Sequence, residues 1–166
     1  MPTGLGITLR EAEIARKATD LNGGIAISLL QVRNAFHHYQ SYGSAVQMLG
    51  EIITDENMTF MRAIDFLDRA SLMLREAKSC GDYANGAGCN GYIAESMDAI
   101  NSIRNEFKGI NVQGASIDGQ VATAWQHLQT TIQEVQAGYD RAMEEHRADY
   151  NRAMEEQTLI ELAQNL

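Results

Sequence analysis

The sequence predicts an all-α protein: an antiparallel four-helix bundle with a short extra N-terminal helix and a long C-terminal helix that can project beyond it. Three observations support this prediction. The single proline is Pro2, so no later residue is forced out of a helix by a missing backbone N–H. Apolar residues recur at alternating steps of three and four, the spacing of one helix face. The fourteen glycines gather mainly between these segments, and 166 residues with 45% apolar side chains are enough for one buried core.

The first two predicted helices differ greatly in length. Thr8 and Glu11 have the spacing of a capping box, which predicts a short helix ending near Asp20. The second helix follows from the clearest periodicity in the chain and is expected to end at Thr54, with Gly43 filling the one gap in its stripe. The stripe consists of Ile25, Leu29, Val32, Phe36, Tyr39, Val46, Leu49 and Ile53.

The third and fourth predicted helices each have one apolar face and a glycine at the end. The third is expected to end at Lys78–Gly81, where a glycine suits a left-handed cap. The fourth covers Gly91–Lys108 and ends at Gly109. The inner face of the third comprises Phe60, Ile64, Leu67 and Leu74, widened by Met58, Met61, Leu72 and Met73. The inner face of the fourth comprises Ile93, Met97, Ile100 and Phe107.

The last predicted helix is much longer than its neighbours. Ser116 or Asp118 caps it, and nothing ends it decisively before Gln164, which gives a length of about 70 Å against about 35 to 45 Å for the second and third helices. Its stripe comprises Val121, Trp125, Leu128, Ile132, Val135 and Tyr139. Residues 1–138 are therefore predicted to form the bundle domain, and residues 139–166 a helical extension continuous with its last helix. That extension must project, bend back or find a partner.

The extension contains a near-repeat. YDRAMEE at residues 139–145 returns eleven residues later as YNRAMEE at residues 150–156. Eleven residues make three nearly straight helical turns, so equivalent side chains lie along one strip. One hypothesis is a solvated helix held by i, i+4 ion pairs of about 0.2 to 0.5 kcal/mol each. The other, which we favour, is a strip that packs on another helix, from a second copy of the chain. The predicted interface comprises Tyr139, Met143, His146, Tyr150, Met154, Leu159, Ile160 and Leu162.

Cys80 and Cys89 bracket a glycine-rich loop. They match no zinc pattern, so in a reducing compartment they are free thiols, and in an oxidising one they could form a disulfide. Gly86–Gly91 matches G-x-G-x-x-G literally, but a helical segment precedes it where a dinucleotide site needs a strand. We therefore predict no nucleotide or other cofactor.

The histidines give no evidence for a catalytic or metal site. Glu does not stand three residues before any of the four, as the helical di-iron motif requires. His38 lies off the main stripe and is expected to be half-exposed, whereas Trp125 is expected to anchor the core. Nucleophile-elbow, Walker and HExxH motifs are also missing from the sequence. We predict a protein that is not an enzyme and has no metal.

Charge and hydropathy exclude other classes. A net charge of −9 disfavours binding to nucleic acid and to anionic membranes. The longest apolar runs fall short of the roughly 18 to 20 residues that span a bilayer, so membrane insertion is not expected. The N-terminal residues lack the pattern of a cleaved signal, so the expected location is cytoplasmic, exported without a classical signal, or within a virion.

The favoured function is that of a structural or assembly protein which self-associates, or docks into a larger complex, through its long C-terminal helix. The layout is loosely similar to helical components of secreted filaments, needle tips and phage particles, without a motif that marks membership. One alternative is a monomeric adaptor or chaperone-like protein that binds a partner helix in a groove containing Met58, Met61, Met73 and Met97. A helical-bundle enzyme with a bound metal is a third.

Overall fold

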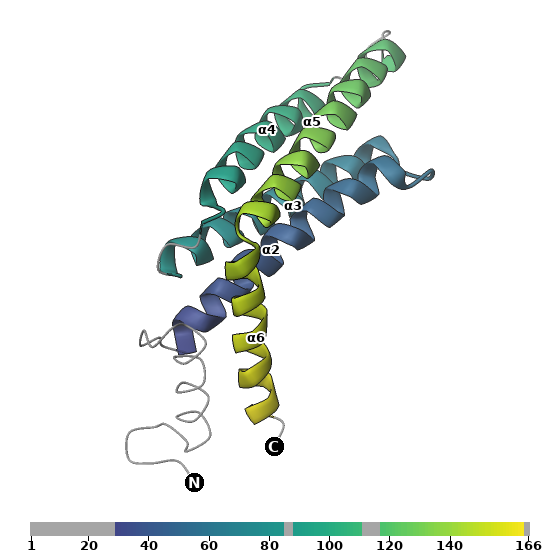
Figure 1. Cartoon of the computed structure of the whole chain (residues 1–166). Helices are drawn as coiled ribbons and strands as arrows, with labels where there is room; N and C mark the ends of the chain where they lie inside the picture. Colours follow the sequence, from purple (N-terminus) through teal and green to yellow (C-terminus); the bar gives the residue numbers. More distant parts are fainter. Residues whose placement is uncertain (1–28, 85–87, 111–116, 165–166) are drawn as a thin grey trace.

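The computed structural model describes residues 29–84, 88–110 and 117–164, and this part of the chain is all-helical. It contains five helices and no strand, and their packing is consistent with a bundle. The helices are α2 (Leu29–Thr54), α3 (Phe60–Tyr83), α4 (Asn90–Lys108), α5 (Ile117–Glu145) and α6 (Arg147–Gln164) (Figure 1). The short helix predicted to end near Asp20 lies outside the described residues.

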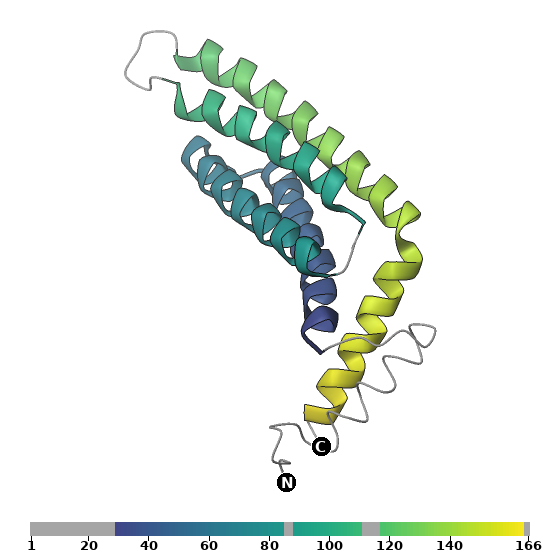
Figure 2. The same ribbon diagram turned by 90° about the vertical axis from the view of Figure 1, so that its left-hand side faces the viewer.

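The helices lie in two pairs. A short turn joins α2 to α3, and these two lie side by side, as do α4 and α5 (Figures 1 and 2). Thr59 begins α3, because its Oγ1 accepts a hydrogen bond from the backbone N–H of Arg62 at 3.2 Å. The α4 helix contacts both α3 and α5, while α2 contacts α5 and α6 as well as α3. Helix α2 therefore packs against three neighbours.

An ion network and an aromatic cluster join these pairs. Asp68 Oδ1 on α3 lies 2.7 Å from Arg104 Nη2 and 2.9 Å from Lys108 Nζ, both on α4. Hydrogen bonds from these two side chains lower the pKa of Asp68. Near the same end, the rings of Phe60 and Phe107 stack with centroids 5.1 Å apart, and Trp125 of α5 lies beside them. Trp125 packs against the core, as the sequence predicted.

The predicted apolar faces of the helices are correct in outline, but on α2 more residues are buried than the predicted stripe contains. Val32, Tyr39 and Leu49 are buried as expected, but His38, predicted to be half-exposed, is fully buried. The reason is that α2 contacts α3 on one side and α5 and α6 on another, so a single stripe cannot describe its buried surface. Tyr42, Ala45 and Ile52 are likewise buried although they lie outside the predicted stripe.

Two features of α3 were predicted wrongly. Met61 and Leu72, assigned to its inner face, are 68% and 61% exposed. Gly81, assigned to a left-handed cap, lies inside the helix, which continues to Tyr83. A Cβ at Gly81 would collide with Asn90 Oδ1 and stand 2.6 Å from His38 Nδ1, so the glycine is explained by the close approach of Asn90 and of α2 rather than by a turn. By contrast, α4 ends at Lys108 as predicted.

The last predicted helix is two helices. The chain continues as α5 through Gly138, bends at His146, and then forms α6 (Figure 2). The prediction that the extension is continuous with the last bundle helix is therefore wrong by one residue, His146. Of the three fates open to the extension, the structure shows bending back: α6 packs against α2.

Candidate functional site

The candidate site is the bend at His146 together with the face of α2 that the repeated segment covers. Two backbone hydrogen bonds carry the chain through the bend: His146 N–H donates to the carbonyl of Ala142, and Tyr150 N–H donates to the carbonyl of His146, both at 2.9 Å. Residues 139–164 contain neither proline nor glycine, so a local helix breaker does not explain the bend. It is explained by the contacts that α6 makes with α2.

The two copies of the repeat make equivalent contacts on α2. The ring of Tyr139 meets that of Tyr42 edge-on at 4.9 Å between centroids, and the ring of Tyr150 meets that of Tyr39 edge-on at 5.7 Å. Tyr39 and Tyr42 are three residues apart and therefore share one face of α2. Gly43 makes room for the first copy, since a Cβ there would lie 3.1 Å from Tyr139 Oη. The repeat is thus a duplicated packing unit for a single helix face.

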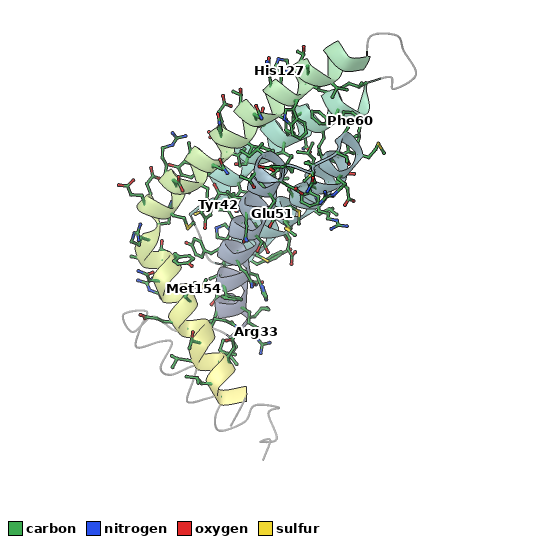
Figure 3. All side chains as sticks on the ribbon, turned by 90° about the vertical axis from the view of Figure 1, so that its right-hand side faces the viewer. Arg33, Tyr42, Glu51, Phe60, His127 and Met154 are labelled. Carbon is green, nitrogen blue, oxygen red and sulfur yellow. The ribbon has the colours of Figure 1, made fainter. Side chains whose placement is uncertain are left out.

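The equivalence extends to the small and flexible residues of each copy. Ala142 and Ala153 occupy the same place in the two copies, and both are buried. Met143 and Met154 also correspond, and both pack half-buried against the core. Figure 3 shows Met154 among the side chains between α6 and α2.

The equivalence ends at the last residue of each copy. Glu145 has a side chain 58% exposed, whereas Glu156 is only 2% exposed. Its Oε1 has no hydrogen-bond partner among the described residues, and burial raises its pKa, against a smaller opposing effect of Arg152. A buried carboxyl without a partner weakens the contact in which it stands. Glu156 stands three residues after Ala153 and four before Ile160, both buried, so the buried face of α6 contains an unfavourable element.

The bend itself rests on the loop between α3 and α4. The ring of His146 lies directly over Gly88, in space that any side chain at position 88 would need. The same ring lies between two carboxylates, with His146 Nδ1 3.8 Å from Asp149 Oδ2 and His146 Nε2 4.0 Å from Glu145 Oε2. Its side chain is 23% exposed, so solvent still reaches it. His146 thus joins the bend to the start of α4.

A buried polar group lies behind the bend. His38 Nδ1 is 2.8 Å from the carbonyl oxygen of Ala77, and because a carbonyl only accepts, Nδ1 carries the proton. Burial lowers the pKa of His38, which keeps the ring neutral, and its Nε2 has no partner among the described residues. Asn90 ties the nearby helix ends together by donating to the Lys78 carbonyl at 3.2 Å and to Asp82 Oδ1 at 2.8 Å.

The far part of α6 is attached by a small separate cluster. Val32 of α2 and Ile160 of α6 are buried against each other, with Leu29, Leu159 and Ala163 packed around them. This pair is not part of the main core. Leu162 points away and is 57% exposed. Among the described residues, the far part of α6 is therefore covered on the side that carries Ile160 and open at Leu162.

The structure distributes the eight predicted interface residues within the chain's own fold. Seven of them contact the chain itself, through the main core, the Val32–Ile160 cluster or Gly88. They are Tyr139, Met143, Tyr150 and Met154 in the first group, Leu159 and Ile160 in the second, and His146. Leu162 alone of the eight is mainly exposed. The predicted strip is therefore already in contact with its own chain, and it can meet another chain only if that internal contact opens.

Sequence reasoning missed the residues that receive the strip. Tyr42, which meets Tyr139, fell outside the predicted α2 stripe, and Gly88, which meets His146, was treated as loop. Tyr39 and Tyr42 could have indicated this contact. They are three residues apart and so share one face of α2, and the strip carries two tyrosines of its own.

Both cysteines are free thiols. Cys80 is half-buried near the end of α3, and Cys89 is fully buried in the main core just before α4. Burial, with Asp149 and Glu145 nearby, raises the pKa of Cys89 to about 11. Its thiol is therefore protonated and unreactive at neutral pH.

Two hollows lie between neighbouring helices of the described residues. One cavity of about 310 Å³ lies between α3 and α4, and a second of about 270 Å³ lies between α4 and α5. The first contains Arg75 and Lys78 opposite Asp82 and Asp98, so its charges largely offset one another. Among the described residues there is no group of three or more His, Cys, Asp or Glu side chains that could hold a metal ion.

Comparison of the chain with protein-family models, with curated proteins and with solved structures finds no match. Within the part of the chain that the structure describes, none of the helices combines the length and the apolar character needed to cross a bilayer. Any functional conclusion therefore rests on the geometry above.

Proposed function

We propose that the protein is a non-enzymatic structural or assembly protein. In this proposal α2 to α5 act as an antiparallel four-helix bundle that serves as scaffold, and residues 139–166 make the contacts with other copies or with a larger complex. The observation that supports it best is the way α6 is attached: beyond a one-residue bend, its far end is held to α2 by a small cluster separate from the core.

Exposed leucines at this end of the molecule support the same proposal. Leu162 of α6 is 57% exposed and Leu30 of α2 is 68% exposed, and each follows or precedes residues of the Val32–Ile160 cluster. Scattered exposed apolar residues are normal, but these two lie on the helices that meet in one small cluster. An additional helix laid across them would extend that cluster.

The structure makes one alternative less well supported. A groove for a partner helix was expected at Met58, Met61, Met73 and Met97, but three of these pack against the core and only Met61 is mainly exposed. The four therefore do not offer one open groove to a partner helix. A helix-binding role would instead need α6 to leave α2.

Light scattering over a concentration series tests the proposal. The informative truncation ends at His146 rather than at Gly138, because Tyr139 and Ala142 belong to the main core. We expect the full chain to form oligomers that the truncated chain does not form, while the far-ultraviolet circular dichroism of α2 to α5 is retained. A full chain that stays monomeric at high concentration, and is unaffected by removal of α6, removes the proposed function.

A further inference from the structure

We propose that two copies of the chain associate by exchanging α6: the bend at His146 opens, and the α6 helix of each copy occupies the α2 face of the other. This inference rests on the proposed function, because it specifies the partner and the route of self-association. The partner is a second copy of this chain.

The first argument is the shortness of the connection. His146 is the one residue between α5 and α6. Because this connection is so short, α6 cannot leave α2 and return to it as a freely tethered helix. If the bend straightens, α5 and α6 become one helix of about 70 Å, and α6 is carried away from its own α2. Short connections of this kind favour exchange between copies over closure within one.

The second argument is that the sequence suits the straight form. The repeat has a period of eleven residues, 3.67 per turn, which matches a nearly straight helix. Residues 139–164 include no proline or glycine, and the bend falls at the first of the four residues between the copies, 146–149. Straightening therefore meets no helix-breaking residue, and the two helical hydrogen bonds through His146, from its N–H to Ala142 and from Tyr150 N–H to its carbonyl, are already present.

The third argument is what opening exposes. Val32 and Tyr39 on α2, now 0% and 2% exposed, lose cover from α6. The side chains that fit this face are known from the structure: Tyr150, Ala153 and Ile160. A second copy carries the same three at the same spacing, so the exchanged contact reproduces the internal one. A reciprocal exchange is two-fold symmetric and closes as a dimer.

The inference predicts which residues of the two copies lie together. Leu29 of α2 and Ala163 of α6 are only half-buried and pack around the same Val32–Ile160 pair. In an exchanged dimer, position 29 of one copy lies near position 163 of the other. A dimer that forms by contact between exposed surfaces around Leu162, without exchange, keeps position 29 beside position 163 of the same copy.

The experiment mixes two single-cysteine variants, Leu29→Cys and Ala163→Cys, in a Cys80→Ser, Cys89→Ala background, and adds a short bismaleimide to the dimeric fraction. We expect a covalent dimer that contains one chain of each kind, and little covalent dimer from either variant alone. A dimeric fraction that yields no mixed covalent dimer overturns the exchange and leaves the proposed function standing. A mixture that stays monomeric at every concentration overturns both.

A second pair of variants retains the native cysteines and so does not depend on that background folding. His146→Ala favours the straight helix, whereas His146→Pro removes the N–H that donates to Ala142 and fixes a kink. We expect the alanine variant to dimerise at least about tenfold more readily than the proline variant. Equal dimerisation of the two overturns the exchange.

Discussion

Tyr150 of α6 meets Tyr39 of α2 edge-on, and this contact repeats, one helical turn along α2, the contact between Tyr139 and Tyr42. The near-repeat in the sequence thus has a structural meaning: each copy supplies a tyrosine to one face of α2. The bend at His146 separates the copies, so the first lies on α5 and the second on α6, although Ala142 and Ala153 are both buried in the main core.

The tyrosine pairs predict a contrast between ring and hydroxyl. Tyr150→Ala removes the ring that packs on Tyr39, and we expect it to lower the free energy of docking α6 by about 2 to 3 kcal/mol. Tyr39→Phe keeps the ring and removes a buried hydroxyl that has no partner among the described residues, so its effect is expected to be within about 1 kcal/mol. Urea denaturation followed by circular dichroism measures both. A larger loss for Tyr39→Phe than for Tyr150→Ala contradicts the assignment.

Two helical glycines predict opposite effects of the same substitution. Gly81→Ala places a Cβ 2.6 Å from His38 Nδ1, and we expect it to destabilise the fold by about 1 to 3 kcal/mol. Gly138→Ala is the matched control, because nothing lies within 4 Å of its Cβ position, and we expect a gain of about 1 kcal/mol. Thermal unfolding compares the two. Equal effects of both substitutions show that His38 and Asn90 do not press against Gly81.

Glu156 predicts that docking of α6 depends on pH. Burial raises its pKa, so the folded state favours the protonated form. Its contribution to stability is therefore complete below the ordinary glutamate pKa of about 4.3 and is lost as pH rises through the raised value. Glu156→Gln removes this dependence and stabilises docking near neutral pH.

The measurement for Glu156 is the difference in unfolding free energy between Glu156→Gln and the unchanged chain at pH 4 and pH 7. Taking this difference cancels the opposite contribution of His38, whose pKa is lowered by burial. Arg152 and Glu155, the charged neighbours that act on Glu156, remain in both chains. A difference that does not grow between pH 4 and pH 7 contradicts the burial of this carboxyl.

The two thiols predict unequal labelling. Cys80 is half-buried and Cys89 fully buried with a pKa of about 11, so a maleimide should modify Cys80 first. Because Cys89 is close to Asp149 and Glu145 on either side of the bend, its labelling should accelerate in Tyr150→Ala. Mass spectrometry of the labelled peptides measures both rates. Rapid modification of Cys89 in the unchanged chain contradicts its place in the core.

The all-helical class and several helix ends could be predicted from periodicity and punctuation. Thr54 and Lys108 end helices as expected, and Leu128, Ile132 and Val135 of the last predicted stripe are buried. Predictions made from one helix at a time failed where several helices converge. His38 is buried, and a side chain at position 81 would clash, because α2 and α3 approach closely there, a tertiary effect that neither local sequence shows.

The candidate site was predicted in part. The strip containing Tyr139 and Tyr150 does pack on a helix, but that helix is α2 of the same chain. The bend could not be predicted, because His146 lies in a sequence that suits an unbroken helix, whereas in the structure its ring contacts Gly88 and α6 packs on α2. Those contacts depend on the whole fold.

Hydrogen exchange of the α6 amides at rising protein concentration tests the central claim most directly, because it reports both release from α2 and capture by a second copy. At low concentration, we expect the α6 amides to exchange as a group, at least about tenfold faster than those of α3 and α4. At high concentration their exchange should slow while that of α3 and α4 stays unchanged. Exchange of α6 that matches α3 and α4 and does not depend on concentration would contradict the account.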